Sequence, residues 1–126
     1  MIIATGIDIV DIDRLAAVVR RHGDAFLQRV CTPAELEAAP HTPAARDAYL
    51  AGRWAVKEAV AKALGTGIGE HCAMTDAEVL NDPAGRPVLT LHGAARKTAD
   101  RLGIATIHIS ISHERHLAVA HAIAER

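Results

Sequence analysis

One uninterrupted helical pattern limits the fold of this chain more than any other feature of its sequence. Thr42 and Pro43 provide a helix cap and a first-turn proline, and the pattern then continues to Gly65, a natural helix stop. This predicts a helix of about 22 residues, ~33 Å long. It is the longest element that the sequence predicts, and the other elements are expected to pack against it.

Alternating apolar and polar residues predict strands at both ends of the chain. Residues 1–10 alternate so that one face carries Asp8 among small side chains. Residues 106–112 give the clearest strand signal, with three isoleucines on one face and polar side chains on the other. Two hairpins are expected, and the five predicted strands cover residues 1–10, 78–80, 87–91, 106–112 and 117–123.

Shorter helices are predicted between these strands. Asp11 or Asp13 can cap the first of them, and Gly23 is a natural stop for it. Thr32 and Glu35 are spaced to form a capping box at the start of the second. The third is expected to begin at Gly93. These short helices are predicted to end near His22, Pro40 and Leu102.

The order of these elements predicts an α+β fold. We expect a single domain over residues 1–126, with a mainly antiparallel sheet packed against one long helix and several short helices. The only aromatic residues are Phe26, Tyr49 and Trp54, so the core must consist of Ala, Val, Ile and Leu. A small core of this kind often gains buried area by oligomerising.

Charge and apolar content argue against several classes of protein. The formal net charge is -1 at pH 7, so no overall field attracts nucleic acid or an anionic membrane. No window approaches the ~20 apolar residues of a membrane span. Cys31 and Cys72 lack metal-ligand spacing and are expected to be free thiols in a reducing compartment. We therefore expect a cytoplasmic protein that binds neither nucleic acid nor membrane.

Two carboxylates stand out as candidates for chemistry. Asp8 lies in an otherwise apolar strand, where an ionised carboxylate is costly unless it is paired or bound to a metal, although it could also face solvent at a strand end. Glu58 lies in the long helix, and its spacing to Lys62 also describes an ordinary surface ion pair. If the two carboxylates meet, they suit Mg²⁺, which accepts one or two carboxylates together with phosphate oxygens.

Polar side chains near the C-terminus are open to more than one interpretation. His108, Ser110 and Ser112 share one strand face, continued by His113 at the turn, and such a row is also typical of a solvated sheet face. The histidines suggest zinc, but strand alternation places His108 and His121 on opposite faces and no cysteine spacing supports a closed site.

Glycines and arginines elsewhere have ordinary explanations too. Gly65–Gly69 resembles a phosphate loop only superficially, because it follows a helix C-terminus and lacks the lysine of such loops. Gly65 is predicted first of all to cap the long helix. Basic side chains also cluster on and after the first helix, where a charge run is usually a solvated face. They are Arg14, Arg20, Arg21 and Arg29.

Three blocks of sequence, taken together, resemble one family. The blocks are Gly6–Val10, then Arg53–Ala59 with Lys62 and Gly65–Ile68, and finally His108–His113. Their order and spacing are far more specific than any single block. On these residues the chain resembles the holo-acyl-carrier-protein synthase group of 4'-phosphopantetheinyl transferases, and the match extends from the first strand to the last.

The resemblance implies roles for individual residues. Asp8 and Glu58 would hold Mg²⁺, which also binds the pyrophosphate of coenzyme A, and Lys62 would stabilise the leaving phosphate. These three residues would be catalytic. The serine proton would pass to Glu58, or to a metal-bound water activated by Glu58 or Asp8. The coenzyme A site would be lined by Arg53, Lys62, Gly65, Gly67, Ser112 and His113.

The same resemblance implies partners. The family typically forms homotrimers with active sites at subunit interfaces. Apo acyl carrier protein, which is acidic, would dock on the helix after Asp8 through Arg14 and Arg21. The chain departs from better-known members mainly in its alanine-rich stretch 38–48 and in Glu114, and the first of these differences could alter the preference for carrier proteins.

The expected activity is transfer of 4'-phosphopantetheine from coenzyme A to a serine of apo acyl carrier protein. The products would be holo acyl carrier protein and adenosine 3',5'-bisphosphate, in support of fatty acid biosynthesis. Two other functions stay open. A trimeric module could bind nucleotides or coenzyme A without metal and without product. A phosphohydrolase could use Asp8, Glu58 and water to release phosphopantetheine with no carrier protein present.

Overall fold

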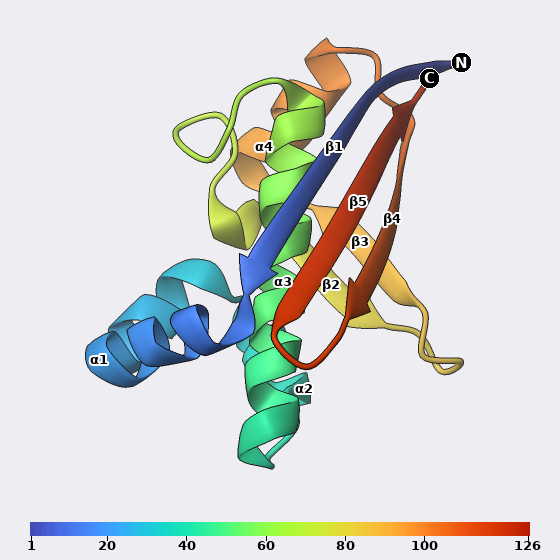
Figure 1. The fold of residues 1–126 in the computed structure, drawn as a ribbon. Helices are drawn as coiled ribbons and strands as arrows, with labels where there is room; N and C mark the ends of the chain where they lie inside the picture. The colour runs from blue at the N-terminus through green and yellow to red at the C-terminus, as the bar shows by residue number, and fades with distance from the viewer.

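The computed structural model describes residues 1–126 and has the α+β fold that the sequence predicts (Figure 1). The long helix is present over 22 residues and ends at Gly65, whose φ of 79° is left-handed. The elements are β1 (Ile2–Asp11), α1 (Ile12–Val30), α2 (Pro33–Ala38), α3 (Pro43–Leu64), the 3₁₀ turn η1 (Met74–Asp76), β2 (Ala77–Asn81), β3 (Pro87–Leu91), α4 (Gly93–Arg101), β4 (Thr106–His113) and β5 (Leu117–Glu125).

All strand pairings are antiparallel, but the strands form two sheets. β1, β5 and β4 form a three-stranded sheet in that order, and β2 pairs only with β3. Helix α3 lies along one face of the larger sheet, and α1 extends away from the end of β1 (Figure 1). The predicted antiparallel architecture is confirmed, with the β2–β3 hairpin as a separate ribbon.

Small side chains allow α3 to lie very close to the sheet. The inward residues of β5 are four alanines, each at most 1% exposed. Gly6 on β1 makes the closest approach, because a Cβ added there would lie only 1.9 Å from the carbonyl oxygen of Ala59. Only glycine fits this position. β1 is therefore held directly against the backbone of α3.

The opposite face of the three-stranded sheet is apolar and uncovered within one chain. Ile7, Ile9 and Leu117 are 61%, 63% and 43% exposed. Strand pairing places Ile9 beside Val119 and Ile7 beside His121 on this face. Contiguous exposed apolar residues of this kind typically mark an interaction surface.

Helix α1 contains the predicted first helix and a second helical segment after it. Asp11 caps it by accepting a hydrogen bond from the backbone N–H of Arg14 at 3.0 Å. Gly23 interrupts the helix as expected, with φ 65° and ψ -148°, but the chain resumes helical geometry and continues to Val30. The first helical segment therefore ends near His22 as predicted, and the segment after Gly23 is the part that the prediction lacked. The second half of α1 is stabilised because it packs in a small cluster with Leu50 of α3.

A buried ion pair connects α2 to α3. The predicted capping box is present, with Thr32 and Glu35 exchanging hydrogen bonds at 2.8 and 3.2 Å. The Glu35 carboxylate also accepts a hydrogen bond from Lys57 Nζ at 2.8 Å, and both side chains are 0% exposed. Lys57 donates its other two hydrogen bonds to the carbonyl oxygens of Met74 and Ala77. All three protons of this buried ammonium are therefore satisfied.

The two cysteines are free, as predicted, and both are buried. Burial raises the pKa of the Cys31 and Cys72 thiols to about 11, so both stay protonated near neutral pH. No helix of the structure combines the length and the apolarity that crossing a bilayer demands.

Candidate active site

The close contact between β1 and α3 brings the two candidate carboxylates together. Asp8 follows Gly6 by two residues, so it lies on the same, helix-facing side of β1. Glu58 and Lys62 are one turn apart on α3. Lys62 Nζ donates hydrogen bonds to Asp8 Oδ1 at 3.2 Å and to the carbonyl oxygen of Ile7 at 2.9 Å. All three predicted catalytic side chains line one cavity of about 460 Å³.

The electrostatics of this group fit a divalent cation. Burial, followed by the negative charge of Asp8, raises the pKa of the Glu58 carboxyl, whereas Lys62 lowers it. Two carboxylates that repel each other across a partly exposed cavity are the oxygen ligands that Mg²⁺ accepts. Asp8 and Glu58 are the candidate metal ligands because they share this cavity, and no group of three or more His, Cys, Asp or Glu side chains that could hold a metal ion is found in the chain.

The rest of this cavity is formed by α1, the end of β1 and Trp54 of α3, and it is largely apolar. Arg14 lies at its edge, whereas Arg21 is exposed on the same helix outside it. Phe26 and Trp54 stack with ring centroids 5.9 Å apart. The site therefore combines acidic and basic groups with an apolar wall, whose members are Ile9, Val10, Leu15, Val18, Phe26 and Trp54.

Two other predicted residues lie in a different place. Arg53 and His113 line a second cavity of about 310 Å³, together with Tyr49, Gly52 and Asn81. The sequence pattern predicts His113 at the turn, but it is the last residue of β4. Strand alternation therefore places it on the helix-facing side of the sheet, beside α3.

Ser112 lies on the other face of the sheet. Strand pairing aligns Asp8 with Ala120 and Ile111, which face α3, whereas Ser112 aligns with Val119 and is exposed. Asp8 and Ser112 are also separated by β5, so they stand two strand spacings apart, ~10 Å, and point in opposite directions. One chain does not bring Ser112, Arg53 and His113 to the carboxylates.

The glycine loop after α3 is engaged mainly with its own helix. Gly65 and Gly67 have φ values of 79° and 66°, which favour glycine. The backbone N–H groups of Gly65, Thr66 and Gly67 all donate to the carbonyl oxygen of Ala61 at the end of α3. The contact of this loop with coenzyme A stays a prediction, and it would have to use groups other than these amides.

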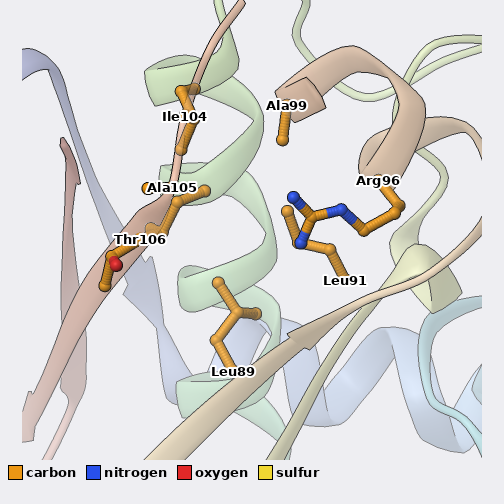
Figure 2. Close-up of a pocket in the computed structure, with 8 residues that line it drawn as sticks. Leu89, Leu91, Arg96, Ala99, Ile104, Ala105 and Thr106 are labelled. Atoms are coloured by element: carbon orange, nitrogen blue, oxygen red, sulfur yellow. The ribbon is translucent and has the colours of Figure 1, made fainter. Parts of the chain in front are cut away.

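A further cavity lies between α4, β3 and the start of β4 (Figure 2). Its volume is about 170 Å³, and most of its lining is aliphatic. Its one charged side chain is Arg96, whose Nη2 and Nε bind Asp100 Oδ1 at 2.6 and 3.1 Å. Because that guanidinium is already paired, this cavity offers little chemistry beside the carboxylate site.

Sequence reasoning missed some residues that shape these sites. Lys57 had been treated only as part of a motif, although a lysine at a core-facing position of the long helix could have indicated a buried partner. Tyr49 and Asn81 gave no signal, because their importance comes from contact with Arg53. The Tyr49 ring centroid is 4.1 Å from Arg53 Cζ, and Asn81 Oδ1 accepts a hydrogen bond from Arg53 at 3.1 Å.

The fold and the site define a small α+β protein in which two carboxylates and a lysine line one partly exposed cavity. The family model of the 4'-phosphopantetheinyl transferase superfamily matches residues 4–120. The chain belongs to this superfamily, as its sequence motifs predict.

Curated relatives and solved structures agree with this family. Holo-[acyl-carrier-protein] synthases of Solidesulfovibrio magneticus and Edwardsiella ictaluri are 50% and 52% identical over 125 and 124 residues, with 99% and 98% of each chain covered. The crystal structure of the Neisseria meningitidis synthase matches with a TM-score of 0.89 at 34% identity over 100% of both chains. The Helicobacter pylori synthase in complex with coenzyme A matches with a TM-score of 0.85 at 32% identity, covering 96% of this chain and 99% of that one.

Proposed function

We propose that the chain is a magnesium-dependent holo-acyl-carrier-protein synthase. It transfers 4'-phosphopantetheine from coenzyme A to a serine of apo acyl carrier protein and releases adenosine 3',5'-bisphosphate. The observation that carries this proposal is the cavity in which Asp8 and Glu58 lie beside Lys62. The names of the relatives support the reaction, and the bound coenzyme A of the Helicobacter pylori synthase supports the donor.

Each side chain of the cavity has a defined task. Asp8 and Glu58 would hold Mg²⁺, which when bound neutralises charge on the pyrophosphate. The Lys62 side chain is 51% exposed and its ammonium donates to the carbonyl oxygen of Ile7, so it can meet a phosphate oxygen without leaving its place. Gly6 keeps Asp8 against α3, and so fixes the distance between the two carboxylates.

The positions of Arg53 and His113 support a site shared between subunits of a homotrimer. These residues line a separate cavity from the carboxylates, and Ser112 points away from Asp8. The exposed apolar face that carries Ile7 and Ile9 would be covered by neighbouring copies. One chain then supplies the metal ligands, and its neighbour supplies the remaining contacts to coenzyme A.

The acidic carrier protein would dock on α1. Arg14 borders the carboxylate cavity, and Arg21 is exposed two turns further along the helix. Both are available to acidic side chains, and the apolar wall beside Arg14 can cover an apolar residue of the carrier. Docking there would bring the reactive serine next to the carboxylates. The two buried free thiols fit a reducing compartment, which supports an enzyme of the cytoplasm.

The reaction is tested by measuring adenosine 3',5'-bisphosphate released from coenzyme A, with and without apo acyl carrier protein and Mg²⁺. Release that needs both supports the transferase. Release without the carrier protein would instead identify a phosphohydrolase, and metal-independent binding without release would identify a binding module. Asp8→Ala and Glu58→Ala should each abolish release while leaving the circular dichroism spectrum unchanged.

The shared site is tested by complementation. Glu58→Ala and His113→Ala chains should each be inactive, but mixed trimers should contain interfaces with both intact halves. Random assembly from equal amounts gives roughly a quarter of such interfaces, so activity should return to that level. Mixed samples that exchange subunits and stay inactive would contradict a shared site.

A further inference from the structure

Arg53 is buried with part of its hydrogen-bonding capacity unused. Arg53 is only 6% exposed, and its Nε has no hydrogen-bond partner. Leaving such a donor unsatisfied is costly, so an acceptor from outside the chain would stabilise it. Because the donor is a guanidinium, the acceptor that suits it best is an anion.

The surroundings of Arg53 indicate where that anion lies. Arg53 lines two cavities, and so do Tyr49 and Asn81. The larger one, of about 480 Å³, also contains Glu37, which repels anions. The other, of about 310 Å³, contains His113, which can donate to one. The anion therefore belongs on the His113 side.

The chemistry of coenzyme A identifies the group. This step rests on the proposed function. Coenzyme A carries a pyrophosphate and a 3'-phosphate, and the pyrophosphate is engaged at Asp8, Glu58 and Lys62. Arg53 and His113 line a different cavity from these three residues. The family resemblance implies that Arg53 and His113 meet phosphates of coenzyme A, and in the proposed function the group they would meet is the 3'-phosphate on the ribose.

Arg53 is held by Tyr49 and Asn81. The Tyr49 ring centroid is 4.1 Å from Arg53 Cζ, and Asn81 Oδ1 binds Arg53 Nη2 at 3.1 Å. Tyr49 is itself anchored, because its hydroxyl donates to the carbonyl oxygen of Glu35 at 2.7 Å. Glu35 is fixed in turn by its buried bond to Lys57. These contacts leave Arg53 little freedom, so its guanidinium is preorganised for a ligand.

We propose that Tyr49 is a positioning residue that presents Arg53 to the 3'-phosphate, and thereby sets the preference of the enzyme for coenzyme A over 3'-dephospho-coenzyme A. Asn81 holds the same guanidinium through its hydrogen bond to Arg53 Nη2. Tyr49 touches neither the pyrophosphate nor the carboxylates, so its effect is confined to the recognition of the donor.

The experiment compares both donors on the full-length wild type and three variants, each checked for folding by thermal denaturation. Tyr49→Leu removes the ring, and should raise KM for coenzyme A by about 5- to 30-fold, which corresponds to the ~1–2 kcal/mol of a partly desolvated cation–π contact. Its kcat should stay within about twofold, and KM for 3'-dephospho-coenzyme A should not change. Asn81→Ala should shift KM in the same direction by less. Tyr49→Phe, which keeps the ring but loses the hydroxyl that anchors it, should lie between the wild type and Tyr49→Leu.

The outcomes separate this proposal from the proposed function. A Tyr49→Leu variant that loses the same factor in kcat/KM for both donors would show a merely structural role and overturn the proposal. If Tyr49→Leu does not fold, Asn81→Ala is compared with the wild type in its place. The binding of adenosine 3',5'-bisphosphate and of adenosine 5'-phosphate is then measured for both proteins, because these two nucleotides differ only in the 3'-phosphate. A wild type that transfers nothing from either donor would overturn the proposed function instead.

Discussion

Replacing Gly6 by alanine tests how the fold builds the site. The added Cβ would lie 1.9 Å from the carbonyl oxygen of Ala59 and 2.9 Å from the backbone N of Ala63. Ordinary contact begins near 3.4 Å, so β1 must move by about 1.5 Å relative to α3, since neither obstacle is a flexible side chain. Overpacking of this kind typically costs about 1–3 kcal/mol of unfolding free energy.

The displacement also reaches the active site, because Asp8 is only two residues away. A misplacement of about 1 Å can lower the rate ~100-fold, so Gly6→Ala should lose more activity than stability. The assay is chemical denaturation in parallel with kcat/KM for transfer. Gly69→Ala is the matched control, because its Cβ would meet nothing within 4 Å. A Gly6→Ala protein with the stability and turnover of the wild type would refute the close contact between β1 and α3.

Three further predictions follow from other contacts. The pKa of Glu58 is raised in the folded protein, so its ionised carboxylate lowers the free energy of unfolding. This loss of stability is present at pH values above the folded-state pKa, and it disappears as the pH falls through that pKa. Metal-free Glu58→Gln should therefore melt higher than the wild type at pH 7, and Mg²⁺ should raise the Tm of the wild type alone. Arg14→Glu should raise KM for the carrier protein far more than KM for coenzyme A, with Arg20→Glu as a control of equal charge on the same helix; equal effects on both substrates would argue against docking at Arg14. Lys57→Met should cost about 3–5 kcal/mol because it strands the buried Glu35 carboxylate, and adding Glu35→Gln should recover part of that loss in denaturant titrations.

Local signals in the sequence were sufficient for most of the fold. The capping box at Thr32 and Glu35 and the helix stop at Gly65 were predicted because each depends on a few neighbouring residues. The second half of α1 was missed, because Gly23 does interrupt the helix and only packing against Leu50 explains why it resumes. The division into two sheets also depends on long-range pairing that no local pattern encodes.

The residues of the candidate site that lie in a sequence motif were predictable. Asp8, Glu58 and Lys62 meet as the resemblance implied, but the sequence could not reveal why, since the reason is the absent side chain of Gly6 against α3. The separation of Ser112 from Asp8 follows from strand pairing, and was invisible before the register was known. The role of Tyr49 depends on its contact with Arg53, so the sequence gave no hint of it.

The central claim is that Asp8 and Glu58 form a metal-dependent site for moving 4'-phosphopantetheine onto a carrier protein. The most direct test is to incubate the purified protein with coenzyme A, Mg²⁺ and apo acyl carrier protein, and to measure the intact mass of the carrier. A gain equal to one phosphopantetheine group, lost on adding EDTA and absent with Glu58→Ala, is the predicted result. A carrier whose mass does not change, or one that gains the group equally with Glu58→Ala, would contradict the account.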